Sequence, residues 1–277
     1  MKVKKSLIKV SKTYISVIVP AYKAEDFIEK NLLQIKKVMD QLQYPYEIIC
    51  VVDGMEDKTY ENALKIAKIF MDKITVTGYL TNLGKGHAVR FGMAKAKGEI
   101  IAFIDAGFDI NPNGLSILLE HFKWYDADII VGSKRHPVSK VKYPWQRKVL
   151  SIGYQILVRL LFGLKVRDTQ TGIKFYKREV LEKTLPRLLV KAWAFDIEIL
   201  AVANYLGFNR IYEAPIELKN EFGGLSVLTS KGFFKFAIGM IIDTWAVFYR
   251  LKILKFYDSK NNKNWITPDY LTFNSKK

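Results

Sequence analysis

The sequence predicts an α/β fold with a mostly parallel central sheet, and three observations support this prediction. Short apolar runs alternate with longer segments of helical spacing through the first half of the chain. Strands that alternate with helices are joined by crossover connections, which build parallel sheets. Polar residues then follow three of the predicted strands, at the carboxyl ends where such sheets bind ligands. These polar ends are residues 20–22, 53–54 and 105–109.

Each predicted element has its own signal. The first strand is a β-branched run that stops at Pro20, and the second and fourth are buried apolar runs that end at Asp53 and Asp105. The segments between the strands have apolar residues at helical spacing. The predicted strands are 14–19, 47–52, 73–80, 99–104 and 128–131, and the predicted helices are 25–41, 59–71, 88–96 and 114–124.

Two apolar stretches in the second half of the chain have a different character. Residues 149–164 are strongly apolar but contain Arg159, and residues 233–249 are interrupted by Lys235 and Asp243. A membrane-spanning helix needs roughly 20 apolar residues. We therefore expect two amphipathic helices that lie in a membrane interface, with ordinary core helices as the alternative. The polar tail after residue 258 is expected to be extended.

Composition limits the class of protein. The 277 residues are 49% hydrophobic, which excludes a disordered chain, and the single Cys50 excludes a disulfide scaffold. The net charge of +17 leaves nucleic acid and an anionic membrane surface as partners. Residues 129–167 hold nine Lys or Arg and no acidic residue. No nucleic-acid motif accompanies them, so the sequence favours an anionic membrane surface and no nucleic acid.

The beginning of the chain carries a localisation prediction. Residues 1–12 contain five Lys and no acidic residue, and the apolar run that follows is too short for a signal-peptide core. We therefore expect a peripheral or monotopic protein on the cytoplasmic face of a membrane, with no transmembrane helix.

Two candidate ligand-binding segments lie before the candidate metal ligands in the sequence. Asp53 beside Gly54 can accept hydrogen bonds from a base or ribose, although Asp–Gly is equally a common turn. Gly84, Lys85 and Gly86 precede a predicted helix, whose N-terminus suits a phosphate. Their spacing is not that of a P-loop.

Asp105 and Asp109 are the candidate metal ligands. They follow a buried strand four residues apart, and carboxylates at a strand exit bind Mg²⁺ or Mn²⁺ against a diphosphate. A loop with capping aspartates is the alternative. His121 and His136 lack the spacing of a zinc site.

Taken together, these motifs resemble the inverting family-2 glycosyltransferases with the GT-A fold. The resemblance covers residues 15 to 217 and depends on SVIVPAYKAED, VVDGMEDKT and FIDAGFD. The segments NLGKGHAVRFGM, RDTQTGIKFYKREV and WAFDIEIL resemble, more specifically, the dolichyl-phosphate glucosyltransferases and dolichyl-phosphate mannose synthases. The resemblance implies a Rossmann-like GT-A domain and a divalent cation, Mg²⁺ or Mn²⁺.

The resemblance also implies roles for matching residues. Asp105 would face the ribose, the diphosphate and the metal, and Asp109 would be the second metal ligand. Asp196 stands where related transferases have their acidic base, and Thr169 would line the donor pocket. The nucleotide-sugar-binding residues would be Pro20, Tyr22, Glu25, Asp53, Lys85, Asp105, Asp168 and Gln170, and the catalytic residues Asp105, Asp109, Arg147 and Asp196.

A second group would bind the phosphate of a lipid acceptor. The mannose synthases use a Gly-Ser-Arg motif and an Arg followed four residues later by Ser. Residues 132–135 and the pair Arg147 and Ser151 match these motifs. A lipid phosphate is already an anionic nucleophile, and cations can hold it near a negatively charged donor. The implied acceptor-phosphate site is Lys134, Arg135, Arg147 and Ser151.

We therefore expect inverting transfer of a hexose from a nucleotide sugar to a polyprenyl (dolichyl-type) phosphate, with a UDP-sugar preferred and GDP-mannose possible. Two alternatives stay open: a glycan or glycolipid hydroxyl as acceptor, and a weakly active sugar-nucleotide-binding scaffold. The scaffold alternative follows from Gly107 and Val52, which stand where the family has acidic residues. The expected parts are a basic segment (1–13), a GT-A domain (14–225, with an interface helix at 148–165), and an amphipathic helix with a polar tail (226–277).

Overall fold

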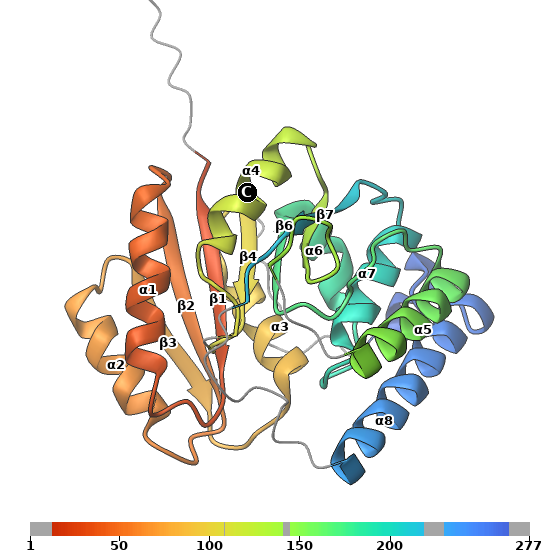
Figure 1. Cartoon of the computed structure of the whole chain (residues 1–277), viewed down its shortest axis with the longest axis horizontal. Coiled ribbons are helices and arrows are strands. Elements are labelled where there is room, and N and C mark those ends of the chain that lie inside the picture. The colour runs from red at the N-terminus through yellow and green to blue at the C-terminus, as the bar shows by residue number, and fades with distance from the viewer. Residues whose placement is uncertain (1–12, 108, 141–144, 219–229, 266–277) are drawn as a thin grey trace, which may run out of the picture.

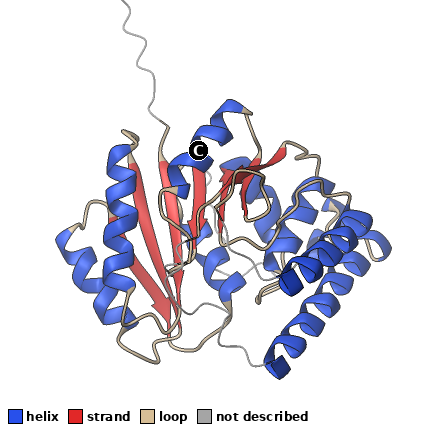
Figure 2. Cartoon of the chain, in the orientation of Figure 1, coloured by secondary structure: helices blue, strands red, loops and turns tan. Residues whose placement is uncertain are grey.

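The computed structural model describes residues 13–107, 109–140, 145–218 and 230–265, and it leaves the side chains of 145–150, 230–236 and 264 undescribed. At its centre is a β-sheet with helices packed on both faces (Figures 1 and 2). The strands in chain order are β1 (Ile15–Ala21), β2 (Tyr46–Asp53), β3 (Ile74–Tyr79), β4 (Ile100–Ile104), β5 (Ile129–Ser133), β6 (Ile173–Lys177) and β7 (Ile211–Pro215).

The strand order β3-β2-β1-β4-β6-β5-β7 produces a mostly parallel seven-stranded sheet. Strands β1 to β4 are parallel to one another, and β5 is parallel to β7. Only β6 is antiparallel to its neighbours β4 and β5 in this described sheet. The predicted α/β fold is confirmed. Because β1, β2 and β4 are parallel neighbours, their carboxyl ends meet at one edge of the sheet.

Helices cover the two faces as separate apolar layers. One layer joins the sheet to α1, α2 and α4, and the other joins it to α3, α5, α6, α7 and α8. The strands are buried on both faces, as β1 shows, because Val17 packs in the first layer and Ile18 in the second. The helices are α1 (Ile28–Gln41), α2 (Thr59–Ile69), α3 (Lys85–Lys95), α4 (Gly114–Trp124), α5 (Trp145–Phe162), α6 (Arg178–Thr184), α7 (Phe195–Tyr205) and α8 (Ser230–Phe248).

All nine elements predicted in the first half of the chain form, with shifted ends. Helix α1 begins at Ile28 rather than residue 25, because the preceding turn is held by a hydrogen bond from Ala24 N–H to Thr59 Oγ1 (2.7 Å). Helix α3 begins at Lys85, three residues earlier than predicted, directly after Gly84 with its φ of +99°. The left-handed backbone of Gly84 ends the loop and starts the helix.

The two apolar stretches of the second half are the helices α5 and α8, which lie side by side (Figure 1). Tyr154 on α5 and Thr244 on α8 share a hydrogen bond of 2.8 Å between their hydroxyl oxygens. A π-helical turn, Tyr249–Ile253, continues α8. No helix in the described ranges is both long enough and apolar enough to cross a bilayer.

The polar tail differs from its prediction. Residues Ser259–Asn264 form a short 3₁₀ helix, whereas the sequence predicts an extended chain. The neighbouring chain is tied to the protein body, since Arg187 Nε donates to the Tyr257 carbonyl oxygen (2.9 Å) and Arg187 NH2 to Ser259 Oγ (3.1 Å). This anchoring gives the polar segment a fixed start, after which local i,i+3 bonding is possible. Residues 266–277 and 1–12 lie outside the described part.

Candidate active site

The loop after β4 carries the central carboxylate of the site. Asp105 N–H donates to the Gly172 carbonyl oxygen (2.9 Å), and Ala106 N–H donates to the carbonyl oxygen of Pro20 (3.2 Å) at the end of β1. Asn31 Nδ2 on α1 donates to the Gly107 carbonyl oxygen (3.1 Å). The loop after β4 is therefore bonded to β1, α1 and the segment before β6.

A chain of alternating charges extends inward from Asp105. Lys85 Nζ, at the start of α3, lies 2.8 Å from Asp105 Oδ2 and 3.9 Å from Asp196 Oδ2. Asp196 Oδ1, on α7, lies 2.6 Å from Lys174 Nζ on β6. Exposure falls along the chain, from 38% for the Asp105 side chain to 15% for Lys85, 2% for Asp196 and none for Lys174. We call these four residues the charge chain.

Burial and charge act in opposite directions on the two lysines. Burial lowers the pKa of Lys85, but the carboxylates of Asp105 and Asp196 outweigh it, so its pKa is raised and the ammonium stays charged. For Lys174, burial is the larger effect and lowers its pKa, although the Asp196 carboxylate opposes the shift. Lys85 therefore stays positively charged beside Asp105.

Several buried polar atoms around Asp105 suit a bound ligand. Asp105 Oδ1, Gln170 Nε2 and Thr171 Oγ1 are buried and have no hydrogen-bond partner among the described residues. Such atoms are uncommon in native proteins, because an unpaired buried polar group destabilises the fold. A carboxylate oxygen with free lone pairs fits a divalent cation. Asp109 is exposed in the same loop, and the described residues contain no cluster of three or more potential metal-ligating side chains.

The Asp105 carboxylate occupies the space that a side chain at position 172 would need. A β-carbon at position 172 would lie 1.9 Å from Asp105 Oδ2 and 2.4 Å from its Cγ. Any other residue would therefore displace the carboxylate or the backbone.

Asp53 lies at the end of β2 and binds the next loop. Its Oδ1 accepts the Leu83 N–H (2.8 Å), and its Oδ2 accepts the Gly84 N–H (3.0 Å). The side chain is 3% exposed. Asp53 thus orients the glycine loop directly before Lys85.

Tyr22 and Glu25 belong to the loop after β1 and bind the loop after β2. Tyr22 Oη donates to Glu56 Oε2 (3.1 Å), and Glu25 Oε2 accepts the Lys58 N–H (2.9 Å). Lys23 Nζ also lies 3.1 Å from Glu56 Oε2. Hydrogen bonds therefore join the two strand-end loops.

Asp168 connects two other predicted segments. Its Oδ2 accepts the Lys134 N–H (3.1 Å), and its Oδ1 accepts the Gln170 N–H (3.2 Å). Glu213 on β7 in turn accepts the N–H groups of Arg167 and Asp168. Asp168 therefore has a positioning role between the end of β5 and the segment that carries Gln170.

The predicted phosphate-binding residues are partly brought together. Arg135 NH1 lies 3.4 Å from the Ser151 carbonyl oxygen on α5 and 3.2 Å from that of Arg167. Lys134 is half-buried beside Arg135. Arg147 lies on α5, but its side chain is outside the described part.

Three residues at the site have no counterpart among the predicted site residues: Lys174, Gly172 and Glu213. Lys174 had a misleading signal, since alternation places it on the face opposite Ile173 and Phe175, where a lysine is ordinarily exposed. Gly172 and Glu213 had none, because their roles come from contacts between distant segments.

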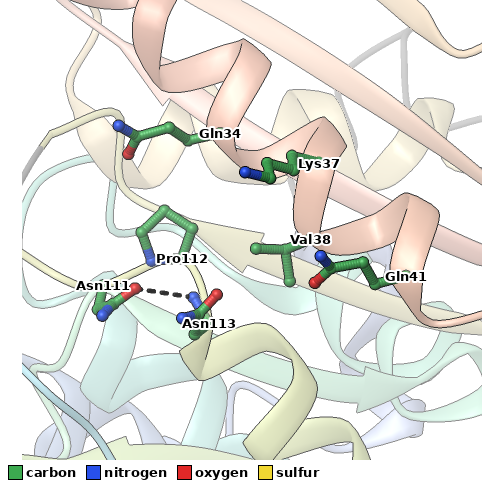
Figure 3. A pocket seen from close by; sticks show the side chains of 7 residues that line it. All are labelled: Gln34, Lys37, Val38, Gln41, Asn111, Pro112 and Asn113. Carbon is green, nitrogen blue, oxygen red and sulfur yellow. Dashed lines mark hydrogen bonds between the residues drawn. The ribbon is translucent and has the colours of Figure 1, made fainter.

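A surface pocket of about 390 Å³ lies elsewhere, between α1 and the chain before α4 (Figure 3). Asn111 Oδ1 accepts the Asn113 N–H there (3.1 Å), and Gln34 and Lys37 line the α1 side. None of the predicted site residues lines this pocket, so its location does not bear on the site at the strand ends.

Solved structures share this fold. Glucosyl-3-phosphoglycerate synthase from Mycobacterium tuberculosis, in complex with Mn²⁺, UDP and phosphoglyceric acid, aligns with a TM-score of 0.64 at 20% identity, over 87% of this chain and 80% of that one. Mannosyl-3-phosphoglycerate synthase from Rubrobacter xylanophilus aligns with a TM-score of 0.67 at 15% identity, over 87% and 75%. The predicted GT-A architecture is therefore confirmed.

Several proteins have a higher sequence identity to this chain than these solved structures do. Dolichyl-phosphate beta-glucosyltransferase ALG5A of Trichomonas vaginalis is 32% identical over 90% of this chain and 77% of its own length. The dolichyl-phosphate beta-glucosyltransferases of Drosophila melanogaster and Homo sapiens are 35% and 32% identical, each over 69% of this chain and 63% of their own length. The sequence model of glycosyl transferase family 2 matches residues 16–185. The chain is a glycosyltransferase, and it belongs to glycosyl transferase family 2.

Proposed function

We propose that this protein transfers a hexose, with glucose as the expected sugar, from a nucleotide sugar to a polyprenyl (dolichyl-type) phosphate, with inversion of the anomeric centre. The observation that carries the proposal is the 32% identity to a dolichyl-phosphate beta-glucosyltransferase over 90% of the chain. The glucosyl sugar of these relatives favours UDP over GDP as the donor nucleotide.

The donor end of the proposal rests on the strand-end loops. Tyr22, Glu25 and Asp53 surround the edge where β1 and β2 end, and we assign the nucleoside to this edge. The diphosphate then lies toward Lys85, whose ammonium is held between two carboxylates. A charged ammonium in a half-buried site stabilises the negative charge that develops on a departing nucleoside diphosphate.

The residues present also fit a divalent cation. Asp105 Oδ1 is buried without a partner among the described residues, and Asp109 follows in the same loop. We assign these two carboxylates as the protein ligands of Mg²⁺ or Mn²⁺. The cation would neutralise charge on the diphosphate of the donor. Lys85 occupies only the other oxygen of Asp105, so the lysine and the cation can share this carboxylate.

The acceptor end uses the basic segment. Lys134, Arg135, Arg147 and Ser151 are the proposed ligands of the acceptor phosphate, and Arg135 already contacts the backbone of Ser151. A phosphate oxygen is a nucleophile at neutral pH and needs no strong base. This agrees with the state of Asp196, which is 2% exposed and paired with Lys174 rather than open toward an acceptor. A sugar hydroxyl as acceptor would require a base.

Membrane docking is the last part of the proposal. The helices α5 and α8 and the π-helical turn expose large apolar side chains on the surface: Ile156, Leu160, Ile238, Ile241, Ile242, Trp245, Tyr249 and Ile253. We call this set the apolar face. Arg159 and Lys252 lie within the same elements, and basic residues beside apolar ones favour an anionic lipid surface. We assign this face to the cytoplasmic leaflet that carries the lipid acceptor.

Nucleotide release from UDP-glucose and GDP-mannose tests the proposal. Purified protein is incubated with each donor and Mg²⁺ or Mn²⁺, with and without dolichyl phosphate. We expect release of UDP that depends on dolichyl phosphate and a glycolipid product labile to mild acid. Transfer to a glycan hydroxyl instead, or no release in folded protein with either donor, would overturn it.

A further inference from the structure

Lys174 has no role in the proposed donor and acceptor sites. It is fully buried on β6, between the apolar residues Ile173 and Phe175. Its ammonium donates to the Thr171 carbonyl oxygen and to Asp196 Oδ1, both at 2.6 Å. Burying a lysine is costly, and a buried ion pair adds little stability compared with apolar residues of similar size. Stability is therefore a weak reason for this pair.

The pair does, however, have a defined outer neighbour. Asp196 Oδ2 faces Lys85 at 3.9 Å, while its Oδ1 is held by Lys174. The ammonium groups of Lys85 and Lys174 lie 5.4 and 5.0 Å from the centre of the Phe103 ring. The Trp193 ring lies 5.5 Å from Lys85 Nζ. Lys85 is thus confined by rings and by two carboxylates, one of which Lys174 orients.

Charge balance gives the pair a second effect. Without Lys174, Asp196 would be a buried carboxylate with a single cation nearby, and Lys85 Nζ would be drawn inward toward it. With Lys174 present, one oxygen of Asp196 is satisfied, and Lys85 can make its shorter contact, 2.8 Å, with Asp105. Lys85 is then directed outward, to the end of the charge chain where Asp105 Oδ1 has no partner among the described residues.

We propose that Lys174 and Asp196 are positioning residues, which hold the Lys85 ammonium at Asp105 for contact with the donor diphosphate. Asp196 then acts through Lys85 and not as the catalytic base. The inference rests on the proposed nucleotide-sugar donor, but it does not depend on the identity of the acceptor.

A thermodynamic cycle tests this role. The pair is replaced by apolar residues in K174M/D196L, Lys85 is replaced in K85M, and the triple variant combines them. Binding of UDP-glucose or GDP-mannose, whichever the wild type binds more tightly, is measured by calorimetry with Mg²⁺ and without acceptor. We expect K174M/D196L and K85M each to weaken donor binding about 10-fold or more, the value of a charge-assisted hydrogen bond. The triple variant should bind no more weakly than K85M, because the pair acts through Lys85.

The matched control is a second lysine–aspartate pair, whose lysine lies on the same strand. Lys177 Nζ on β6 lies 2.7 Å from Asp126 Oδ1, away from the charge chain, so K177M/D126L should bind the donor as the wild type does. Should K174M/D196L not fold, the same cycle is measured with D196N. A base at position 196 would lower kcat in D196N with donor binding unchanged, and that result would overturn the proposal.

Two further outcomes would also contradict it. In the first, K174M/D196L binds the donor with an affinity within about threefold of wild type, a difference below 1 kcal/mol. In the second, the affinity losses of K174M/D196L and K85M multiply in the triple variant. Failure of the polyprenyl-phosphate proposal is recognised separately. In that case the wild type binds a donor and shows the cycle, yet transfers no sugar to dolichyl phosphate. A wild type that binds neither donor would overturn both.

Discussion

Gly172 and Asp105 are so close that a β-carbon at position 172 would come within 1.9 Å of Asp105 Oδ2. The Gly172 carbonyl oxygen also accepts the Asp105 N–H at 2.9 Å. The absence of a side chain on one residue thus allows the carboxylate of the other to lie against the backbone, where it meets Lys85. This contact joins the segment before β6 to the loop after β4.

Gly172→Ala should therefore lower the transfer rate strongly and the thermal stability only slightly. The added methyl group displaces the Asp105 carboxylate, and a shift of about 1 Å in a catalytic site can lower the rate roughly 100-fold. Steady-state transfer rates and thermal melting of the variant measure the two effects. Gly239→Ala is the control, because a β-carbon there meets no atom of the described residues within 4 Å. A variant at position 172 with near wild-type kcat/KM would contradict the assignment.

Asp53→Asn should loosen the glycine loop. Asp53 accepts one backbone N–H on each oxygen, whereas asparagine would turn an amide donor toward one of them. The unpaired donors should cost about 1–3 kcal/mol of unfolding free energy, measured by urea denaturation. Donor binding should weaken as well, because the loop directly precedes Lys85. Unchanged stability together with lost nucleotide binding would instead indicate that Asp53 contacts only the nucleotide.

Replacement of two residues of the apolar face, Leu160→Ser with Ile242→Ser, should weaken membrane binding without unfolding the protein. These side chains are 78% and 61% exposed, so unfolding free energy should change by less than about 0.5 kcal/mol each. Loss of their burial in lipid should reduce sedimentation with phosphatidylserine vesicles roughly 10-fold. Ile69→Ser on α2, at 68% exposure, is the matched control and should bind vesicles normally. Equal binding by all three proteins would disprove the docking surface.

Asp40 should make stability depend on pH. Burial raises the pKa of its carboxyl, but hydrogen bonds from Lys36, Lys73 and Tyr46 outweigh it and hold this pKa well below its usual range. A lowered pKa contributes stability above the unfolded-state value of about 3.9, and this contribution is lost as the pH falls toward the folded-state value.

The variant Asp40→Asn isolates this contribution. The Asp40 side chain is 35% exposed, so solvent screens its interactions. The unfolding free energy of the wild type should therefore exceed that of Asp40→Asn by only about 1 kcal/mol at pH 6. The difference should shrink at pH 3 and below. Urea denaturation at both pH values measures it, and a difference that does not change with pH would refute the assignment.

The elements of the first half could be predicted because their signals are local. Apolar runs such as Ile100–Ile104 and the helical spacing of Gly114–Trp124 depend only on neighbouring residues, and both elements form. The sequence pattern predicts neither β6 nor α7. Their runs are interrupted by Lys174, Asp196 and Glu198, which are buried in spite of their charge.

Lys174, Asp196 and Glu198 are buried because partners from distant segments bind their charged groups. Glu198, for example, accepts the Tyr257 Oη hydrogen bond (2.7 Å) from beyond α8 and the Val190 N–H (2.8 Å). Burial raises the pKa of Glu198, and these donors together with Arg250 oppose that shift. The pattern of residues along the chain contains no information on such partners. The charged residues in these segments therefore suggest solvent-exposed positions, although they are buried.

By itself, the sequence determined the family, the parallel strands and the set of chemistry-bearing residues at their carboxyl ends, because motif spacing and hydrophobic periodicity are properties of short segments. Only the tertiary structure decided how those residues act on one another. It pairs Lys85 with Asp105, orients Asp196 with Lys174, and brings Gly172 against the Asp105 carboxylate. The physical reason is that the free energy of a buried charged group, and its pKa, depend on how deeply it is buried and on which groups bind it. Here those partners come from α3, β4, β6 and α7, which meet only when the sheet is complete.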